Sequence, residues 1–342
     1  MSENMKVSVW YNNNDIRLEE VPTPSPGPGE MLVKVMACGI CGSDVVEWYR
    51  LPRAPLIQGH EVGVEVVKTG TGVTNYQNGD RLFIAPKIPC LKCRYCMNGH
   101  YPQCAEVQDR LPGGFAEYIL VPRELVANGC YRLPNNVSFD QATFIEPLAC
   151  VVRAQKLADV KEGQIVLILG SGMSGLLHVK LAKYKNCTVF ATDINKSRLE
   201  MARLFGADHV VLADSDILKQ LIEVTGRKAD VVIVTTSAHS ALDQAWQTVD
   251  MGGVVVLFAV PGPEKDVIVP VNDFWRKEIR VMTSYYCGPP DIQDALDLIA
   301  KRIIRVDDLV THRLPLKDTD KGFKMLLEGA GSLKIIIKPQ DQ

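Results

Sequence analysis

The sequence has no long apolar run and no marked excess of charge of either sign. Its longest hydrophobic stretches, such as Gly253 to Val260, fall well short of the roughly 20 residues that a membrane-spanning helix needs. With 38 basic and 40 acidic residues the net charge is -2, and like charges form no block. This balance argues against a nucleic-acid groove or an anionic membrane surface as the main partner. The first six residues lack the apolar core of a secretory signal, so we expect a cytoplasmic protein.

Internal repeats and low-complexity tracts are absent as well. A chain of 342 residues is longer than one typical domain, and 46% hydrophobic residues suffice for two cores. Up to about residue 152, short β-branched runs alternate with turns rich in glycine and proline. This alternation of β-branched runs and turns predicts a mostly β unit, with strands at 32–35, 62–68, 81–85 and 118–121.

The pattern changes after residue 152, where apolar strands begin to alternate with helical stretches. Ile165 to Leu169 is a continuous apolar run, as a strand buried on both faces requires. Such alternation predicts right-handed crossovers and a parallel, doubly wound sheet. We expect strands at 165–169, 188–192, 209–211, 230–234, 253–258 and 279–283, with helices at 176–185, 197–205, 217–225 and 242–249. Beyond residue 287 we expect helices at 291–301 and 320–328 and a closing strand at 333–338 that can return to the first unit.

Four cysteines are spaced as ligands of one metal ion. They follow the pattern C-x2-C-x2-C-x7-C, at Cys90, Cys93, Cys96 and Cys104. Four thiolates this close can surround one Zn²⁺ tetrahedrally and leave no open position, which defines a structural site. Free thiols or an iron–sulfur ligand set are the alternatives, but only the first three cysteines match the spacing of the ferredoxin run. In a cytosolic chain, clustered cysteines bind metal more often than they form disulfides.

A glycine-rich turn follows the strand at 165–169 and opens a helix. Gly170, Gly172 and Gly175 form the G-x-G-x-x-G pattern, and Asp193 stands eighteen residues later at the end of the next strand. These glycines permit a tight turn, close approach of a diphosphate to the backbone, and close packing of helix on sheet. The diphosphate would lie at the helix N-terminus. A carboxylate at Asp193 would accept hydrogen bonds from the ribose and repel a 2′-phosphate, which favours NAD over NADP.

A second set of metal-ligand types lies in the β unit. Cys41 stands in Gly39-Ile40-Cys41-Gly42-Ser43-Asp44, and His60-Glu61 follow. Three protein ligands with one open position define a catalytic zinc site. Glu146, between two apolar runs, adds a further carboxylate. The alternatives are a small core cysteine, a surface His-Glu pair and an ordinary helix or turn carboxylate.

Together these motifs resemble the zinc-containing medium-chain alcohol dehydrogenase family, and within it the sorbitol, polyol and threonine dehydrogenase branch. The resemblance covers essentially the whole chain with its motifs in the same order. It implies a GroES-like, mostly β catalytic domain at 1–152, completed by 288–342, with an inserted Rossmann domain at 153–287. It also implies an active site in the cleft between the two domains.

The resemblance implies a role for each residue of the second metal set. Cys41 and His60 match the first two ligands of the catalytic zinc, and Glu61 follows the ligand histidine as in the branch where this glutamate also reaches the metal. Glu146 falls where classical members have a third cysteine ligand, and in polyol-type relatives it binds zinc directly or through water. We expect Glu61 and Glu146 to share or exchange that role.

Ser43 and Asp44 match the residues that serve the substrate and the ligand histidine. Ser43 corresponds to the hydroxyl that bonds the substrate oxygen, and Asp44 to the carboxylate that orients the ligand histidine. The family's outer proton-relay histidine is replaced by Val46. Water, or a carboxylate such as Glu47 or Glu146, is expected to take its place.

For the cofactor, the resemblance places four more residues along NAD. They are Ser174, Arg198 at the adenine end, Val260, and Tyr285 near the nicotinamide. Polyol-type members often carry a substrate-binding arginine where Tyr285 stands. Four basic residues are expected near the cleft mouth, and solvated surface charge is favoured over recognition of an anionic substrate: Arg50, Arg53, Lys87 and Arg110.

The expected function is therefore zinc-dependent hydride transfer between an alcohol, of a polyol, cyclitol or sugar derivative, and NAD. Two zinc ions per chain, a small-molecule alcohol or ketone substrate, and a homodimer or homotetramer are expected. An L-threonine-type or amino-alcohol dehydrogenase is the alternative within enzymes. A zinc-ribbon nucleic-acid binder conflicts with the near-neutral charge, and a non-catalytic relative conflicts with the complete set of site residues.

Overall fold

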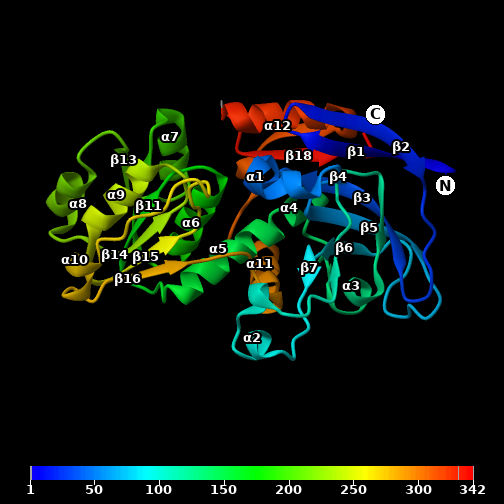
Figure 1. Cartoon of the computed structure of the whole chain (residues 1–342), viewed down its shortest axis with the longest axis horizontal. Coiled ribbons are helices and arrows are strands. Elements are labelled where there is room, and N and C mark those ends of the chain that lie inside the picture. The colour runs from blue at the N-terminus through cyan, green and yellow to red at the C-terminus, as the bar shows by residue number, and fades with distance from the viewer. Residues whose placement is uncertain (1, 330, 342) are drawn as a thin grey trace. The chain divides into compact units, whose positions relative to one another are not determined.

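The computed structural model describes residues 2–329 and 331–341. The chain divides into two compact units: a first unit of Met1–Ala149 with Cys287–Gln342, and a second unit of Cys150–Tyr286. Each unit has its own sheets (Figure 1). Among the described residues, none of the helices has the length and apolar character that crossing a bilayer requires.

The main sheet of the first unit has the order β10-β6-β5-β3-β18-β17, with β9 also paired to β3. Its strands are β3 (Met31–Gly39), β5 (Glu61–Thr69), β6 (Arg81–Ile84), β9 (Tyr118–Val121), β10 (Cys130–Arg132), β17 (Val310–Pro315) and β18 (Lys334–Lys338). All pairings are antiparallel except that of β17 with β18. Because β18 pairs with β3 through Ile336 and Gly39, the end of the chain returns to the first unit, which confirms the expected closing strand (Figure 1).

Smaller elements surround this sheet. A three-stranded sheet has the order β2-β1-β4, and β7 pairs with β8. The hairpin of β1 and β2 in the three-stranded sheet was not predicted from the sequence. The apolar core lies on the main sheet and includes an edge-to-face contact between Phe115 and Phe323, with ring centroids 5.9 Å apart. The bounds are β1 (Asn4–Asn12), β2 (Asp15–Pro22), β4 (Leu56–Ile57), β7 (Lys87–Ile88), β8 (Asp109–Arg110), α1 (Glu47–Arg50), α2 (Arg94–Met97), α3 (Arg123–Asn128), α4 (Phe139–Ala142), α5 (Ile145–Leu157), α11 (Pro289–Ala300) and α12 (Thr319–Glu328).

The second unit contains one six-stranded sheet with the order β13-β12-β11-β14-β15-β16, and every neighbouring pair is parallel. Numbered within the unit, this is the order 3-2-1-4-5-6 of a doubly wound dinucleotide-binding sheet. The bounds are β11 (Ile165–Leu169), α6 (Met173–Tyr184), β12 (Thr188–Asp193), α7 (Lys196–Leu204), β13 (His209–Leu212), α8 (Ile217–Thr225), β14 (Ala229–Val234), α9 (His239–Thr248), β15 (Val249–Leu257), α10 (Val271–Trp275) and β16 (Arg280–Thr283).

The expected fold class, a GroES-like unit with an inserted Rossmann unit, is confirmed by this architecture. β11 is buried at every position, as its unbroken apolar run required. Helix α6 begins at Met173, three residues before the expected start, because the glycine turn itself leads into the first helical residues. Glu146 lies in the first turn of α5, where Pro147 is tolerated since the amides there have no partner within the helix.

Candidate functional site

The four clustered cysteines come together in the lobe around α2. Their sulfur atoms all lie within 4.8 Å of one another. Cys90 Sγ and Cys96 Sγ are 4.0 Å apart, and Cys93 Sγ and Cys96 Sγ are 3.6 Å apart. Sulfurs bound tetrahedrally at about 2.3 Å from one ion would lie about 3.8 Å apart. The four donors therefore fit a single zinc ion, and all of them are free thiols.

The electrostatics of this lobe are those of a thiolate site. The pKa of Cys93 is lowered to about 6, first by hydrogen bonds from the backbone at Cys96 and Ala105. Burial, followed by the neighbouring sulfurs, raises the pKa of Cys96 to about 12. A zinc ion removes this conflict, because its charge stabilises every coordinated sulfur as a thiolate.

The second group brings together Cys41, His60 and Glu61, whose ligand atoms all lie within 4.8 Å of one another. Strand pairing produces this proximity. Gly39, at the end of β3, is opposite Glu61, at the start of β5, so the residues just beyond each strand end meet. Cys41 is the N-cap of the short turn Gly42–Val45, and its sulfur accepts hydrogen bonds at 3.4 Å from both the backbone N–H and the hydroxyl of Ser43.

Asp44 connects the turn to the histidine. Its side chain is fully buried. Oδ2 accepts a hydrogen bond from the Cys41 N–H at 3.0 Å, and Oδ1 lies 3.4 Å from His60 Nδ1 and accepts a bond from Arg50 Nη2 at 3.0 Å. Because Nδ1 of His60 faces this carboxylate, Nε2 is the ring nitrogen that can bind a metal.

The pKa shifts within this group follow from burial and charge. Burial acts to lower the pKa of His60, but the charges of Asp44 and Cys41 outweigh it and raise the pKa well above its usual value. Burial acts to raise the pKa of Asp44, but His60 and Arg50 prevail and lower it. Asp44 therefore holds the imidazole as an ionised carboxylate.

Glu61 completes the group, and its second contact comes from the far end of the chain. Both Glu61 and Lys334 are fully buried, and Lys334 Nζ donates a hydrogen bond to Glu61 Oε2. Glu61 Oε1 has no hydrogen-bond partner among the described residues. A buried carboxylate oxygen without a partner is costly in an apolar setting, and a metal ion is the partner that its neighbours Cys41 and His60 provide for. Gly39 is required here, because a Cβ at that position would overlap Glu61 and Lys334.

Two other carboxylates were expected near this centre, and neither belongs to its group of ligand atoms. Glu146 is grouped with Cys287, and the group of Cys41 and His60 contains Glu61 instead. Glu47 Oε1 accepts a hydrogen bond from the backbone N–H of Asn13 at 2.9 Å. Since Glu47 is engaged with the β1–β2 turn, the structure gives no support to a relay role for it.

The glycine turn of the second unit has the geometry expected of a phosphate cradle. Gly170 has φ +99°, which favours glycine. A Cβ on Gly175 would lie 2.0 Å from the Gly170 carbonyl oxygen, so the helix can approach the strand only without a side chain there. At Gly172 a Cβ would meet nothing within 4 Å. The backbone of Gly172 therefore borders open space at the N-terminus of α6, where amide N–H groups attract an anion.

Asp193 ends β12 beside this turn and is nearly fully buried. Its carboxylate accepts hydrogen bonds from the backbone N–H groups of Ser171 and Asn195, each at 2.8 Å. Arg198 Nη1 lies 3.9 Å from its Oδ2. The glycine turn and the acid thus form one connected structure, as the motif spacing implied.

The remaining residues expected along the cofactor belong to the same unit. Ser174 lies in the first turn of α6, close to the glycines. Val260 follows β15, and its side chain is 49% exposed. Tyr285 follows β16 and is 54% exposed. Their accessible side chains are compatible with lining a bound molecule.

Two residues that contact the group of Cys41, His60 and Glu61 were missed or misjudged in the sequence. Arg50 was expected to be solvated surface charge, but its side chain is only 12% exposed and bonds Ser43 and Asp44. Lys334 was not predicted to be a site residue, because it lies in an apolar strand far from the motifs in the sequence. A basic residue inside the run Leu333 to Lys338, at a position buried on the sheet, was the available signal.

The fold and these two centres define a zinc-binding dehydrogenase with a nicotinamide-binding sheet. Residues 27–135 match the alcohol dehydrogenase GroES-like domain, and residues 175–301 match the zinc-binding dehydrogenase domain. The chain is 32% identical to sorbitol dehydrogenase of Gallus gallus over 99% of this chain and 98% of that protein. It therefore belongs to the zinc-containing medium-chain alcohol dehydrogenase family, in its sorbitol and polyol dehydrogenase-like branch.

Solved structures agree with this assignment. A zinc-binding dehydrogenase from Sinorhizobium meliloti 1021, bound to NADP, superposes with a TM-score of 0.88 at 29% identity, covering 99% of this chain and 100% of that one. The 2R,3R-butanediol dehydrogenase of Bacillus subtilis gives a TM-score of 0.86 at 30% identity, covering 98% and 100%. The chain is accordingly a zinc- and nicotinamide-dependent oxidoreductase.

Proposed function

We propose that this enzyme transfers hydride between a secondary alcohol of a polyol, cyclitol or sugar derivative and NAD. The observation that carries the proposal is the group of Cys41, His60 and Glu61 with the Ser43 hydroxyl 3.4 Å from Cys41 Sγ. Three ligands and a hydroxyl at their edge are the parts that alcohol activation requires.

We assign a catalytic zinc to Cys41, His60 and Glu61, and a structural zinc to the four cysteines from Cys90 to Cys104. Bound catalytic zinc supplies Lewis acidity toward the substrate oxygen, and the nicotinamide supplies the hydride-accepting ring. The protein residues bind and orient these groups. Glu61 rather than Glu146 is the third ligand in this arrangement, and Glu146 stays a predicted alternative for exchange.

In the proposed mechanism the substrate's hydroxyl proton leaves through Ser43, whose oxygen accepts it while the serine hydroxyl passes its own proton to water. Its oxygen lies beside the ligand sulfur, and its hydroxyl can donate to or accept from a substrate oxygen within the same small space. Asp44 holds the imidazole of His60, so that the metal ligand keeps one tautomer during turnover.

NAD is the proposed cofactor form, with its diphosphate at Gly170, Gly172 and Gly175. The support is Asp193: its carboxylate lies at the end of β12, where it would accept bonds from a ribose diol and repel a 2′-phosphate. Arg198, on α7, would lie at the adenine end. Ser174, Val260 and Tyr285 line the remainder of the cofactor in this proposal.

A polyol substrate is supported by the relatives, which include sorbitol dehydrogenases and D-xylulose and butanediol enzymes. The alcohols in these reactions carry a secondary hydroxyl next to a further hydroxyl, and D-xylulose is a ketone of the same type. The hydroxy amino acid alternative receives no comparable support.

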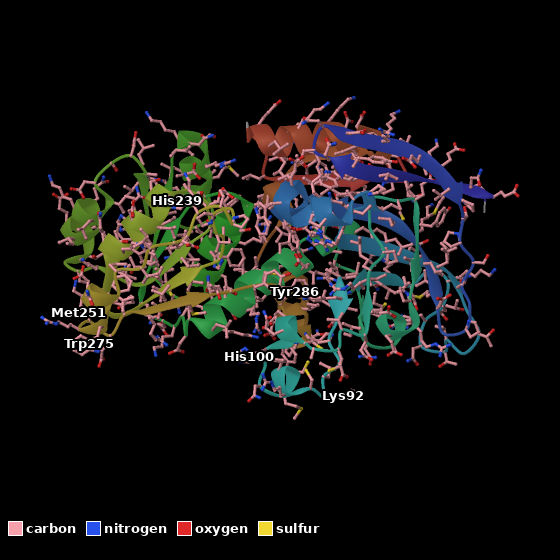
Figure 2. The ribbon with its side chains drawn as sticks, viewed as in Figure 1. Lys92, His100, His239, Met251, Trp275 and Tyr286 are labelled. Atoms are coloured by element: carbon pink, nitrogen blue, oxygen red, sulfur yellow. The ribbon has the colours of Figure 1, made fainter. Side chains whose placement is uncertain are left out.

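A homo-oligomer is proposed from the edge of the second unit's sheet. β16 is an edge strand, and two exposed apolar side chains, Met251 on β15 and Trp275 on α10, 74% and 76% exposed, lie at one end of the unit (Figure 2). Ile268 and Val271 on the neighbouring segment are exposed as well. A second copy related by a twofold axis would cover this apolar edge.

The free thiols of all ten cysteines support the reducing cytoplasm as the location.

The test is an initial-rate assay of reduced cofactor with sorbitol, xylitol, 2,3-butanediol, myo-inositol and L-threonine, each with NAD and with NADP. We expect the highest kcat/KM with a polyol and NAD. A preference for L-threonine, or no rate with any alcohol, would contradict the substrate class.

A further inference from the structure

The side chain of Arg50 folds back from α1 onto the turn that carries Ser43 and Asp44. Nε donates a hydrogen bond to the Ser43 carbonyl oxygen at 3.0 Å. Nη2 donates to Ser43 Oγ and to Asp44 Oδ1, each at 3.0 Å. Three bonds fix the plane of the guanidinium, and burial of most of the side chain shields them from solvent.

The contact with Ser43 determines which way its hydroxyl points. A serine hydroxyl has one hydrogen to donate and two lone pairs. Arg50 fills one lone pair with a proton that a guanidinium does not release, so the serine hydrogen must point elsewhere. In the structure it is directed to Cys41 Sγ at 3.4 Å, on the side of the metal ligands.

The contact with Asp44 steadies the histidine ligand. Oδ1 receives Arg50 Nη2 and also faces His60 Nδ1, so one carboxylate oxygen is shared between the cation and the imidazole. Asp44 is fully buried, and Arg50 is the permanent cation beside it. Loss of Arg50 would leave the bond from the Cys41 N–H to Oδ2 as the main contact that orients this carboxylate toward the imidazole.

We propose that Arg50 is a positioning residue of the active site, which holds the Ser43 hydroxyl with its hydrogen on the side of the metal ligands and holds Asp44 against His60. The inference rests on the proposed function, since it assumes that the reacting oxygen binds beside Cys41. It assigns a permanent cation to the turn that carries Ser43, near Val46, which replaces the family's titrating relay histidine. The positive charge beside Ser43 also stabilises negative charge that develops on the oxygens during alcohol oxidation.

Arg53 provides a matched control. Arg50 and Arg53 both stack on the ring of Tyr49, at 5.1 and 4.6 Å from its centroid. Arg53 donates to the Tyr49 carbonyl oxygen at 3.1 Å, and among the described residues it forms no hydrogen bond with Ser43 and no ion pair with Asp44. Removal of either arginine costs a cation and a stacking contact, but only Arg50 touches the site.

The experiment compares Arg50→Ala, Arg50→Lys and Arg53→Ala as full-length enzymes. Steady-state kinetics use sorbitol or xylitol with NAD, and competition with a chelator measures how tightly the catalytic zinc is held. Arg50→Ala is also assayed with about 50 mM guanidinium chloride, far below denaturing concentrations, against the same concentration of sodium chloride. Thermal unfolding of each variant reports whether it folds.

We expect Arg50→Ala to lower kcat roughly 100-fold with little change in KM, as loss of one preorganised donor does. Its catalytic zinc should be held about 10-fold more weakly, since residues behind metal ligands have effects of this size. Guanidinium should restore part of the rate, and Arg50→Lys should retain part of it. Arg53→Ala should match the wild type in all three measurements.

If Arg50→Ala folds and equals Arg53→Ala in kcat and zinc retention, the inference is overturned while the proposed function stands. An equal loss of rate in Arg50→Ala and Arg53→Ala, with no guanidinium rescue, also overturns it by showing a general structural effect. If the wild type oxidises no alcohol, the proposed function fails instead. The chelator competition then still tests whether Arg50 holds the metal ligands.

Discussion

Lys334 and Glu61 form an ion pair inside the first unit, although 273 positions separate them in the chain. Lys334 lies on β18, the strand that returns from the end of the chain, and Glu61 begins β5 beside His60. Neither side chain is accessible to solvent. The metal centre therefore depends on a residue from the final strand, which ties closure of the first unit to the orientation of one proposed ligand.

Removal of Lys334 should destabilise the protein, because Oε2 of the buried Glu61 carboxylate loses its paired cation. We predict that Lys334→Met lowers the free energy of unfolding by about 3 kcal/mol, as breaking one side of a buried pair does. The matched control is Lys338→Met, whose partner Asp140 is partly exposed, so that loss should be about 1 kcal/mol or less. Urea unfolding measures both. If the two variants lower the free energy of unfolding equally, the buried pair of Lys334 and Glu61 stabilises the fold no more than a partly exposed pair does.

Cys41→Ser should abolish catalysis and spare the fold. We predict a fall of roughly 10³-fold or more in kcat/KM, because the substrate oxygen loses its activating ion. Metal analysis should find one zinc per chain instead of two, with thermal unfolding close to that of the wild type. Turnover at the wild-type level, or loss of both zinc ions, would contradict the assignment of two separate centres.

Cys93→Ser should destabilise the fold and leave the zinc at Cys41 in place. Opening the four-cysteine site removes an ion that links the segments around α2, and we predict a fall in Tm on the order of 10 °C. The zinc at Cys41 should remain. Differential scanning calorimetry with metal analysis tests this. An unchanged Tm with one zinc lost would mean that the lobe does not need its ion.

Asp193→Ser should shift the cofactor preference. Without the carboxylate, a ribose diol loses its acceptor and a 2′-phosphate loses a repelling charge. We predict a rise of about tenfold in KM for NAD and a lower KM for NADP, measured with the best alcohol. The control is Asp208→Asn. Asp208 lies just before β13 and pairs with Lys183, so its replacement should leave the NAD to NADP ratio unchanged. If the ratio moves equally in both variants, Asp193 does not select the cofactor.

Asp140 gives a prediction for pH. Burial acts to raise its pKa, but hydrogen bonds from Lys338 and Arg313 prevail and lower it below the ordinary value of 3.8. A depressed pKa in the folded state means that the stabilisation is present above the unfolded pKa and is lost as pH falls through the folded one. Urea midpoints of the wild type and Asp140→Asn should therefore differ at pH 7, and the difference should shrink as pH falls below the ordinary value of 3.8 and through the lower folded-state pKa. A constant difference across this range would contradict the ion-pair explanation.

Local patterns in the sequence identified those parts of the fold that local physics determines. The run Ile165 to Leu169 can only be a buried strand, and Gly170, Gly172 and Gly175 each have a geometric reason visible in the motif. The cysteine spacing likewise keeps its ligands within one short segment. In such cases the residues that must meet are close in the chain, so their type and spacing are enough.

Contacts that depend on the tertiary arrangement could not be predicted in this way. Arg50 looks like one of several loop cations, and only the fold of α1 over the preceding turn turns it toward Ser43. Lys334 becomes a partner of Glu61 only after β18 pairs with β3. The position of Glu61 beside Cys41 likewise depends on the pairing of β3 with β5.

The most direct test of this account is the rate of NAD reduction with a polyol, measured before and after the more weakly held zinc is removed and then restored. We predict a rate that disappears with loss of one zinc per chain and returns when zinc is added back. A rate that persists without that ion, or the absence of any rate in the fully loaded protein, would contradict a catalytic metal held by Cys41, His60 and Glu61.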